Sequence, residues 1–117
     1  METPREFSIG PSMCLGKIEV DDIVTGTYKI KTPKGDTYEL RKENERLSLE
    51  DRNTEIGALV LSSPSSGSIW MGNTCIGEYE TAAYGERVIP YKDGQKQRDK
   101  VEQITPLDYL LRTIRDS

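Results

Sequence analysis

Hydrophobic and polar residues alternate between Thr27 and Arg41, and a Pro33-to-Gly35 turn interrupts the segment near its centre. Proline fits the first central position of a type I turn, and glycine supplies the positive φ of a bulged three-residue loop. Pairing outward from this turn predicts a β-hairpin with one apolar and one polar face, because successive side chains of a strand point to opposite sides. The predicted cross-strand pairs are Ile30 with Tyr38, Tyr28 with Leu40, and Lys29 with Glu39.

The residues before this hairpin have a weaker pattern. Three of them share its apolar phase and extend the first strand backwards past a bulge at Gly26; they are Ile18, Val20 and Val24. Nearer the N-terminus, prolines and a glycine surround the apolar residues Phe7 and Ile9. We therefore expect residues 1–13 to form a flexible, irregular arm and residues 14–117 to form a single β-rich domain.

Further strands are predicted in the second half of the chain. Residues 42–56 are mostly charged and lack the apolar stripe of a helix, so we expect a long solvated connection there. The apolar run Gly57–Ser62 has the length of a central strand, and Pro90 places the strand Arg87–Tyr91 at a sheet edge. Between them, glycine as the first residue of the Gly72-Asn73 pair suits a type II′ turn. This second hairpin would pair Trp70 with Cys75 and Ile69 with Ile76.

The C-terminal segment carries a helical pattern, which predicts an α-helix over residues 105–115. Thr105 is a suitable N-cap, and Pro106 fits the first helical position. The apolar residues recur at i, i+3, i+4 and i+7 and so form one stripe, made of Leu107, Leu110, Leu111 and Ile114. A helix of about ten residues does not persist alone in water. The stripe must therefore pack on this domain's own sheet or in a groove on a partner.

Together these elements predict a mainly β fold, a small antiparallel β-sandwich or barrel of about six or seven strands with one C-terminal α-helix. The 16 basic and 20 acidic residues give a net charge of −4, which argues against general nucleic-acid binding. The chain has no apolar run of transmembrane length and no signal-peptide pattern at its start. We expect a soluble protein that is cytoplasmic or carried within a virus particle.

The residue types exclude several chemistries. Histidine is absent, so the chain has no Ser-His-Asp or Cys-His machinery and no histidine-ligated metal site of its own. Cys14 and Cys75 lack metal-ligand spacing and are expected to be small buried hydrophobes, with a disulfide between them as the alternative. Glu78 and Glu80 share a strand face near Trp70, and a carboxylate-based hydrolase is the enzymatic hypothesis that remains. We expect no catalytic residue, no metal and no cofactor.

Two surfaces are candidates for binding. Cations gather on the polar face and tip of the first hairpin and form a candidate anion-binding site of Lys29, Lys31, Lys34 and Arg41. The second hairpin has apolar residues on both faces, as an interface strand would. With the terminal helix, it predicts an interaction surface of Trp70, Cys75, Tyr79, Leu107, Leu110, Leu111 and Ile114.

The function favoured by these features is a non-catalytic protein-interaction or assembly module that binds a protein partner or a second copy of itself. Compact acidic chains without enzymatic signatures are typical of viral or phage structural and accessory proteins. One alternative is an acidic inhibitor or immunity-type protein that masks a basic enzyme site. Another is a protein that binds a small anionic, nucleotide-like ligand.

Overall fold

The computed structural model describes residues 4–9, 13–24, 27–31, 35–82 and 85–116. Within these residues the chain forms ten β-strands, one turn of 3₁₀-helix (η1) and one α-helix. Their bounds are β1 Pro4–Ile9, β2 Met13–Val24, β3 Thr27–Lys31, β4 Thr37–Glu43, β5 Arg46–Asp51, β6 Thr54–Ser63, β7 Ser66–Met71, β8 Thr74–Ala82, β9 Gly85–Lys92, β10 Gln95–Lys96, η1 Arg98–Lys100 and α1 Pro106–Asp116.

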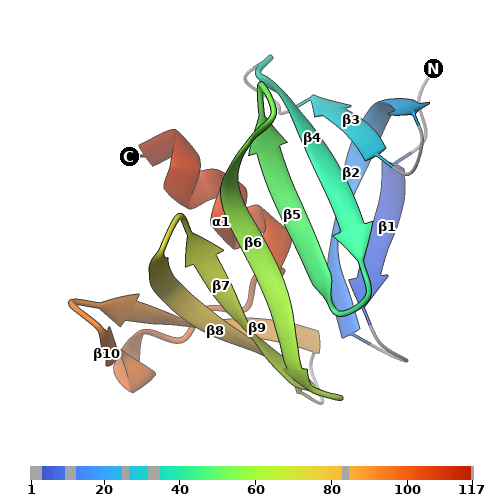
Figure 1. Ribbon diagram of the computed structural model, residues 1–117. Coiled ribbons are helices and arrows are strands. Elements are labelled where there is room, and N and C mark those ends of the chain that lie inside the picture. The colour runs from blue at the N-terminus through green and yellow to red at the C-terminus, as the bar shows by residue number, and fades with distance from the viewer. Residues whose placement is uncertain (1–3, 10–12, 25–26, 32–34, 83–84, 117) are drawn as a thin grey trace.

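The strands form an antiparallel meander, in which each strand pairs with the next one along the chain. The sheet curls so far that β2 comes into contact with β8 and β9, and α1 packs on its inner face against β2, β6, β7 and β9 (Figure 1). A mainly β antiparallel fold with one C-terminal helix is thus confirmed. The described residues hold ten strands rather than six or seven. No helix among them is long and apolar enough to cross a membrane.

The first predicted hairpin is present as β3 and β4. Its register pairs Ile30 with Tyr38, Tyr28 with Leu40 and Lys29 with Glu39, as the alternation predicts. Ile30 and Leu40 are fully buried on the apolar face, while Lys29 is exposed on the polar face. Gly35 has a φ of 93°, which suits its predicted place in the turn. Pro33 and the predicted bulge at Gly26 lie outside the described residues.

The N-terminal prediction of an irregular arm is wrong for residues 4–9. These residues form β1, an antiparallel partner of β2. Phe7 is only 4% exposed, and its ring meets the ring of Tyr28 edge-on, with 5.1 Å between the centroids. Phe7 lies directly opposite Gly16, which has no side chain to compete for that space. The packing of one aromatic ring therefore outweighs the turn-forming residues around it.

The predicted solvated connection over residues 42–56 is also wrong. The segment completes β4, forms all of β5 and begins β6; Arg52 and Asn53 have φ values of 52° and 67°, which a tight type I′ turn requires. Leu47 and Leu49 are buried on the inner face, and charged residues occupy positions on the outer face. This is the alternation of a half-buried strand. Only two apolar residues carry it, and the surrounding charges obscure it.

The second hairpin, β7 and β8, turns at Gly72 with a φ of 64°, as a type II′ turn requires. Trp70 pairs with Cys75 as predicted, but Ile69 pairs with Gly77 instead of Ile76, because the register shifts between Ile69 and Trp70. The carbonyl oxygen of Ile76, left beside this β-bulge, accepts a hydrogen bond of 3.0 Å from the Tyr109 hydroxyl of α1. The bulge is therefore fastened to the helix.

The sheet-edge strand predicted around Pro90 is β9, and its outer side is partly covered. A turn at Asp93-Gly94, both with positive φ, returns the chain to form β10 against Tyr91 and Lys92. Farther along β9, Val88 and Glu102 exchange two backbone hydrogen bonds of 2.9 Å. Pro90 thus lies on a strand whose edge away from β8 is paired only over short stretches, by β10 and by Glu102.

The predicted helix is confirmed over Pro106–Asp116, and its apolar stripe packs on this chain's own sheet. The Thr105 hydroxyl accepts a hydrogen bond from the Asp108 backbone N–H at 3.4 Å and donates one to the Asp108 carboxylate at 2.8 Å. Two glycines let the helix approach closely. A Cβ at Gly16 would lie 2.8 Å from the Cβ of Leu107, and one at Gly57 would lie 2.9 Å from a methyl group of Leu110.

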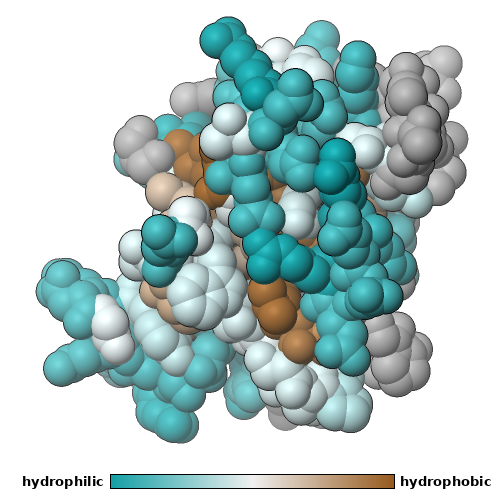
Figure 2. Space-filling model, in the orientation of Figure 1, coloured by the Kyte–Doolittle hydropathy of each residue, from teal (hydrophilic) through white to brown (hydrophobic). Residues whose placement is uncertain are grey.

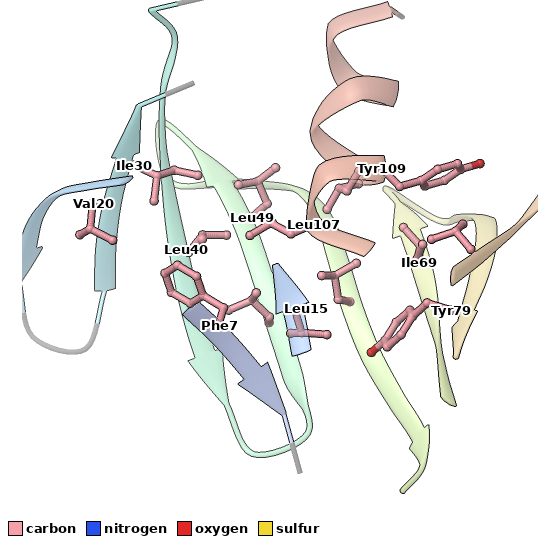
Figure 3. Close-up of a cluster of buried hydrophobic side chains, with 14 residues drawn as sticks. Phe7, Leu15, Val20, Ile30, Leu40, Leu49, Ile69, Tyr79, Leu107 and Tyr109 are labelled. Carbon is pink, nitrogen blue, oxygen red and sulfur yellow. The ribbon is translucent and has the colours of Figure 1, made fainter. Parts of the chain in front are cut away.

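The core fills the space between the curled sheet and α1 (Figure 3). Its largest fully buried side chains are Tyr79, Leu15, Ile30, Leu40, Leu47, Leu49, Leu59, Ile69, Leu107 and Leu110. Because the inner face is filled by side chains from both layers, a binding site for a partner has to be sought on the outer face of the sheet or at its edges.

Candidate functional site

The outer face of the sheet is made of residues that alternate with the core positions. Leu59, Ile69 and Tyr79 point inward, so their chain neighbours point outward. Strand pairing arranges the outward-pointing residues in two rows across β5 to β9. We call these two rows the Trp70 face. The rows are Ser48–Ala58–Trp70–Cys75 and Arg46–Val60–Ser68–Glu78–Ile89. Figure 2 shows the molecule from the side on which β4, β5 and β6 face the viewer, with part of α1 visible beside β6; this side is mostly hydrophilic, with smaller groups of pale and brown side chains.

Trp70 is the only tryptophan of the chain and lies in the middle of this face. Its indole N–H donates a hydrogen bond of 2.9 Å to the Ser68 hydroxyl, two residues back on the same strand. Ala58, directly opposite on β6, is only 1% exposed although it belongs to the outer face. Larger neighbouring side chains therefore cover Ala58, and the indole is held along the sheet while part of it remains accessible.

Beside Trp70, the carboxylate of Glu78 receives hydrogen bonds from two neighbouring elements. The Tyr91 hydroxyl donates to one oxygen at 2.5 Å, and the Lys96 ammonium group pairs with the other at 2.8 Å. The Lys96 hydrogen bond, followed by that of Tyr91, lowers the pKa of Glu78. The same contact with Glu78 raises the pKa of Tyr91 to about 12. Near neutral pH the cluster therefore holds an ionised carboxylate and a protonated phenol.

Three further ion pairs connect neighbouring strands on the outer face. Arg46 of β5 contacts Glu55 of β6 at 2.5 Å, and this hydrogen bond is the largest cause of the lowered pKa of Glu55. Arg41 lies 3.8 Å from Glu50, and Arg87 forms a close ion pair with Glu80. Each of these carboxylates therefore has a cation of the same chain beside it.

These contacts bear on the hypothesis of a carboxylate hydrolase. Glu78 and Glu80 do point to the same face, but each is held by a cation, and the pKa of Glu78 is lowered. A general acid needs a raised pKa, so this geometry gives that hypothesis no support. Among the described residues, no group of three or more carboxylate or thiol side chains is placed to hold a metal ion.

The predicted interaction residues separate into two groups. Trp70 and Cys75 lie on the outer face, and Cys75 is a free thiol. Tyr79, Leu107 and Leu110 are at most 1% exposed in the core, so the prediction that they form an accessible surface is wrong; Leu111 and Ile114 are partly buried against that core. For Tyr79 the cause is the bulge at Ile76, because one extra residue moves the following side chains to the opposite face.

The candidate anion-binding residues are only partly brought together. Lys29 and Lys31 are exposed on β3, and Lys34 lies outside the described residues. Arg41 is also exposed but lies beside Glu50, and Lys29 lies opposite Glu39. Acidic side chains thus interrupt the cationic surface, which weakens its attraction for an anion.

Several residues on or beside the Trp70 face were not identified from the sequence. Tyr91 and Lys96 join Glu78 because the Asp93-Gly94 turn pairs these two residues across β9 and β10. The Asp-Gly signal for that turn is readable in the sequence. Arg46 and Ser48 were missed with β5 itself. The chain matches no protein-family model, and comparisons with curated proteins and with solved structures give no match.

Proposed function

We propose that the protein is a non-catalytic interaction module that docks a protein partner through the Trp70 face. Trp70 carries this proposal, because a partly exposed tryptophan on a sheet face is a typical anchor of a protein–protein contact. Tryptophan buries a large area with few rotatable bonds, and its truncation often costs about 2 kcal/mol or more of binding free energy.

The apolar stripe of α1 and the ring of Phe7 are occupied within the chain. The stripe of α1 packs in the core, and the ring of Phe7 packs against Tyr28. Val101, at 38%, is the most exposed large hydrophobic residue among the described residues. It follows Lys100 of η1, beyond the strands that carry Trp70. On the Trp70 face, Trp70 is the largest apolar side chain that remains partly exposed.

The charges of the outer face favour this proposal over an acidic inhibitor. Such an inhibitor needs carboxylates that are available to a basic enzyme site. In this chain Glu55 and Glu80 each contact a cation on the neighbouring strand, and Glu78 contacts Lys96 of β10, one strand beyond β9. A basic partner would have to displace these cations, so a predominantly charge-driven association gains little.

Site-specific photo-cross-linking tests the proposal. A photoreactive phenylalanine analogue replaces Trp70 in the full chain, which is then irradiated in the cells that normally make it. A matched control places the same analogue at Thr37, an exposed residue of β4 outside the Trp70 face. We expect a discrete covalent adduct with a polypeptide from position 70 and none from position 37. Equal labelling from both positions, or none from position 70, would refute the proposal.

A further inference from the structure

Building on the proposed docking role of the Trp70 face, we infer that the partner is a second copy of this chain, related by a two-fold axis along β6. In this arrangement Trp70 of each copy lies over Arg46 and Ser48 of the other. The inference rests on the symmetry of the face about β6, on the exposed guanidinium group of Arg46, and on the balance of charge across the strip.

Strand pairing places Trp70 and Ser48 at equivalent positions on the two sides of β6. Ala58 of β6 pairs with Ser48 of β5 on one side and with Trp70 of β7 on the other. The large side chain of Trp70 and the small one of Ser48 therefore lie one strand away from Ala58, on opposite sides of β6. A two-fold axis along β6, in the plane between two copies, exchanges the two sides and brings each Trp70 over the Ser48 of the other copy.

The chemistry of the contact suits an indole ring. Arg46 lies over Ser48, to whose hydroxyl its Nε donates at 3.3 Å, and Ser48 is only 6% exposed. The Arg46 side chain is itself 43% exposed, and Glu55 holds its guanidinium group in place. A planar guanidinium group with an open face is a good stacking partner for tryptophan. Ordering it within the chain beforehand also lowers the entropy lost on association.

The electrostatics of the face permit identical copies to meet. In a two-fold interface the same patch of both copies comes together, so a patch with a net charge repels itself. Here the strip holds Arg46 with Glu55, and the adjoining rows hold Glu78 with Lys96 and Glu80 with Arg87. Each of these carboxylates has a cation of its own chain beside it, including Glu55 on β6, which would lie near its copy at the axis; the pairs therefore reduce the repulsion between two such faces.

The curvature of the sheet limits the strength of the contact. Two sheets that curl around their own helices touch along a strip parallel to the strands, and β5, β6 and β7 form that strip (Figure 1). Such a contact buries less than the roughly 1,600 Å² of a standard interface. We therefore expect a reversible dimer with a dissociation constant on the order of 10–100 μM.

Sedimentation equilibrium of the full chain tests this inference, over a range from about 5 μM to 1 mM chosen to bracket that constant. Arg46→Gln and Trp70→Ala should each weaken dimerisation about tenfold or more, as expected for an anchor and its stacking partner. Arg87→Gln is the matched control, because Arg87 also pairs with a glutamate across strands but lies beyond the strip. It should change the dissociation constant less than about twofold. Circular dichroism melts confirm that each variant is folded.

A charge exchange at the axis gives an independent test. Val60 is partly exposed on β6, two residues from Ala58, so it should meet Val60 of the second copy. Val60→Glu alone and Val60→Arg alone should be monomers, because like charges meet at the axis. An equimolar mixture of the two should form a heterodimer. Dimers of either single variant, a mixture that stays monomeric, or an equal effect of Arg46→Gln and Arg87→Gln would overturn the inference.

The two proposals fail in different ways. A wild-type chain that stays monomeric up to about 1 mM overturns the second copy as partner. If cross-linking from position 70 then captures a different polypeptide, the proposed docking role of the face stands. An absence of adducts from position 70 removes the proposed function as well.

Discussion

Removing the hydroxyl of Tyr79 should leave the protein as stable as before or make it more stable. The residue is fully buried, and its hydroxyl has no hydrogen-bond partner among the described residues. Burial raises the pKa of this phenol. The ring lies against Gly67 of β7, where a Cβ would collide with the Tyr79 ring. Tyr79→Phe keeps this packing and deletes only the unpaired polar atom.

The magnitude follows from the cost of burying an unpaired hydroxyl, which mutational data place at about 1–3 kcal/mol. Part of this gain is lost because the deleted oxygen leaves a small gap in the packing. We expect Tyr79→Phe to change the free energy of unfolding by roughly 0 to +2 kcal/mol. For a domain of this size, a gain of 1 kcal/mol raises Tm by about 3–5 °C.

Tyr109→Phe is the matched control, because it deletes the same atom from a hydroxyl that has a partner. The Tyr109 hydroxyl donates to the Ile76 carbonyl at 3.0 Å, so its removal leaves that carbonyl unpaired and should cost about 1–2 kcal/mol. Urea unfolding followed by circular dichroism measures both variants. A loss of more than about 1 kcal/mol in Tyr79→Phe would refute the reasoning, since the hydroxyl would then have a stabilising partner.

Three further predictions concern single side chains. The pKa of Glu78 is lowered on folding, so its contribution to stability should be present above the pKa of the unfolded chain and lost as pH falls through the folded pKa. Glu78→Gln should therefore flatten the acidic part of a curve of unfolding free energy against pH. An unchanged acidic part would contradict the Lys96 and Tyr91 contacts. Gly67→Ala should lower the free energy of unfolding by about 3 kcal/mol or more, because the added Cβ would meet the Val60 carbonyl oxygen. A urea titration that gives a decrease below about 1 kcal/mol would disprove that close approach. Thr105→Ala should lower the free energy of unfolding by about 1 kcal/mol through loss of the helix cap, and thermal melts matching the wild type would show that the cap is dispensable.

The fold could be predicted where local patterns agree with the tertiary packing. The β3–β4 register follows from its alternation, since a slip by one residue would turn Ile30 and Leu40 to the outer face. β5 was missed because Leu47 and Leu49 are its only buried apolar residues, and charged residues surround them in the sequence. β1 was missed because Phe7 is stabilised by Tyr28, which is distant in the sequence. Contacts of that kind leave no periodic signal.

The candidate site was predicted in part for similar reasons. Trp70 and Cys75 were paired correctly, because a two-residue turn fixes the residues nearest to it. Beyond that turn, the bulge at Ile76 reverses the facing of Tyr79, and bulges of this kind have no reliable sequence signature. The bulge is fastened by Tyr109 from the C-terminal helix, 33 residues away, and alternation within β8 does not contain that information.

The central claim is that the Trp70 face becomes buried when the chain associates, and the fluorescence of Trp70 tests it most directly because the chain has no other tryptophan. Emission and quenching by acrylamide are measured on the wild-type chain from about 5 μM to 1 mM, alongside its sedimentation. The account predicts that quenching falls and the emission shifts to shorter wavelength as the mass approaches that of a dimer. A doubling of mass with unchanged Trp70 emission and quenching would contradict it.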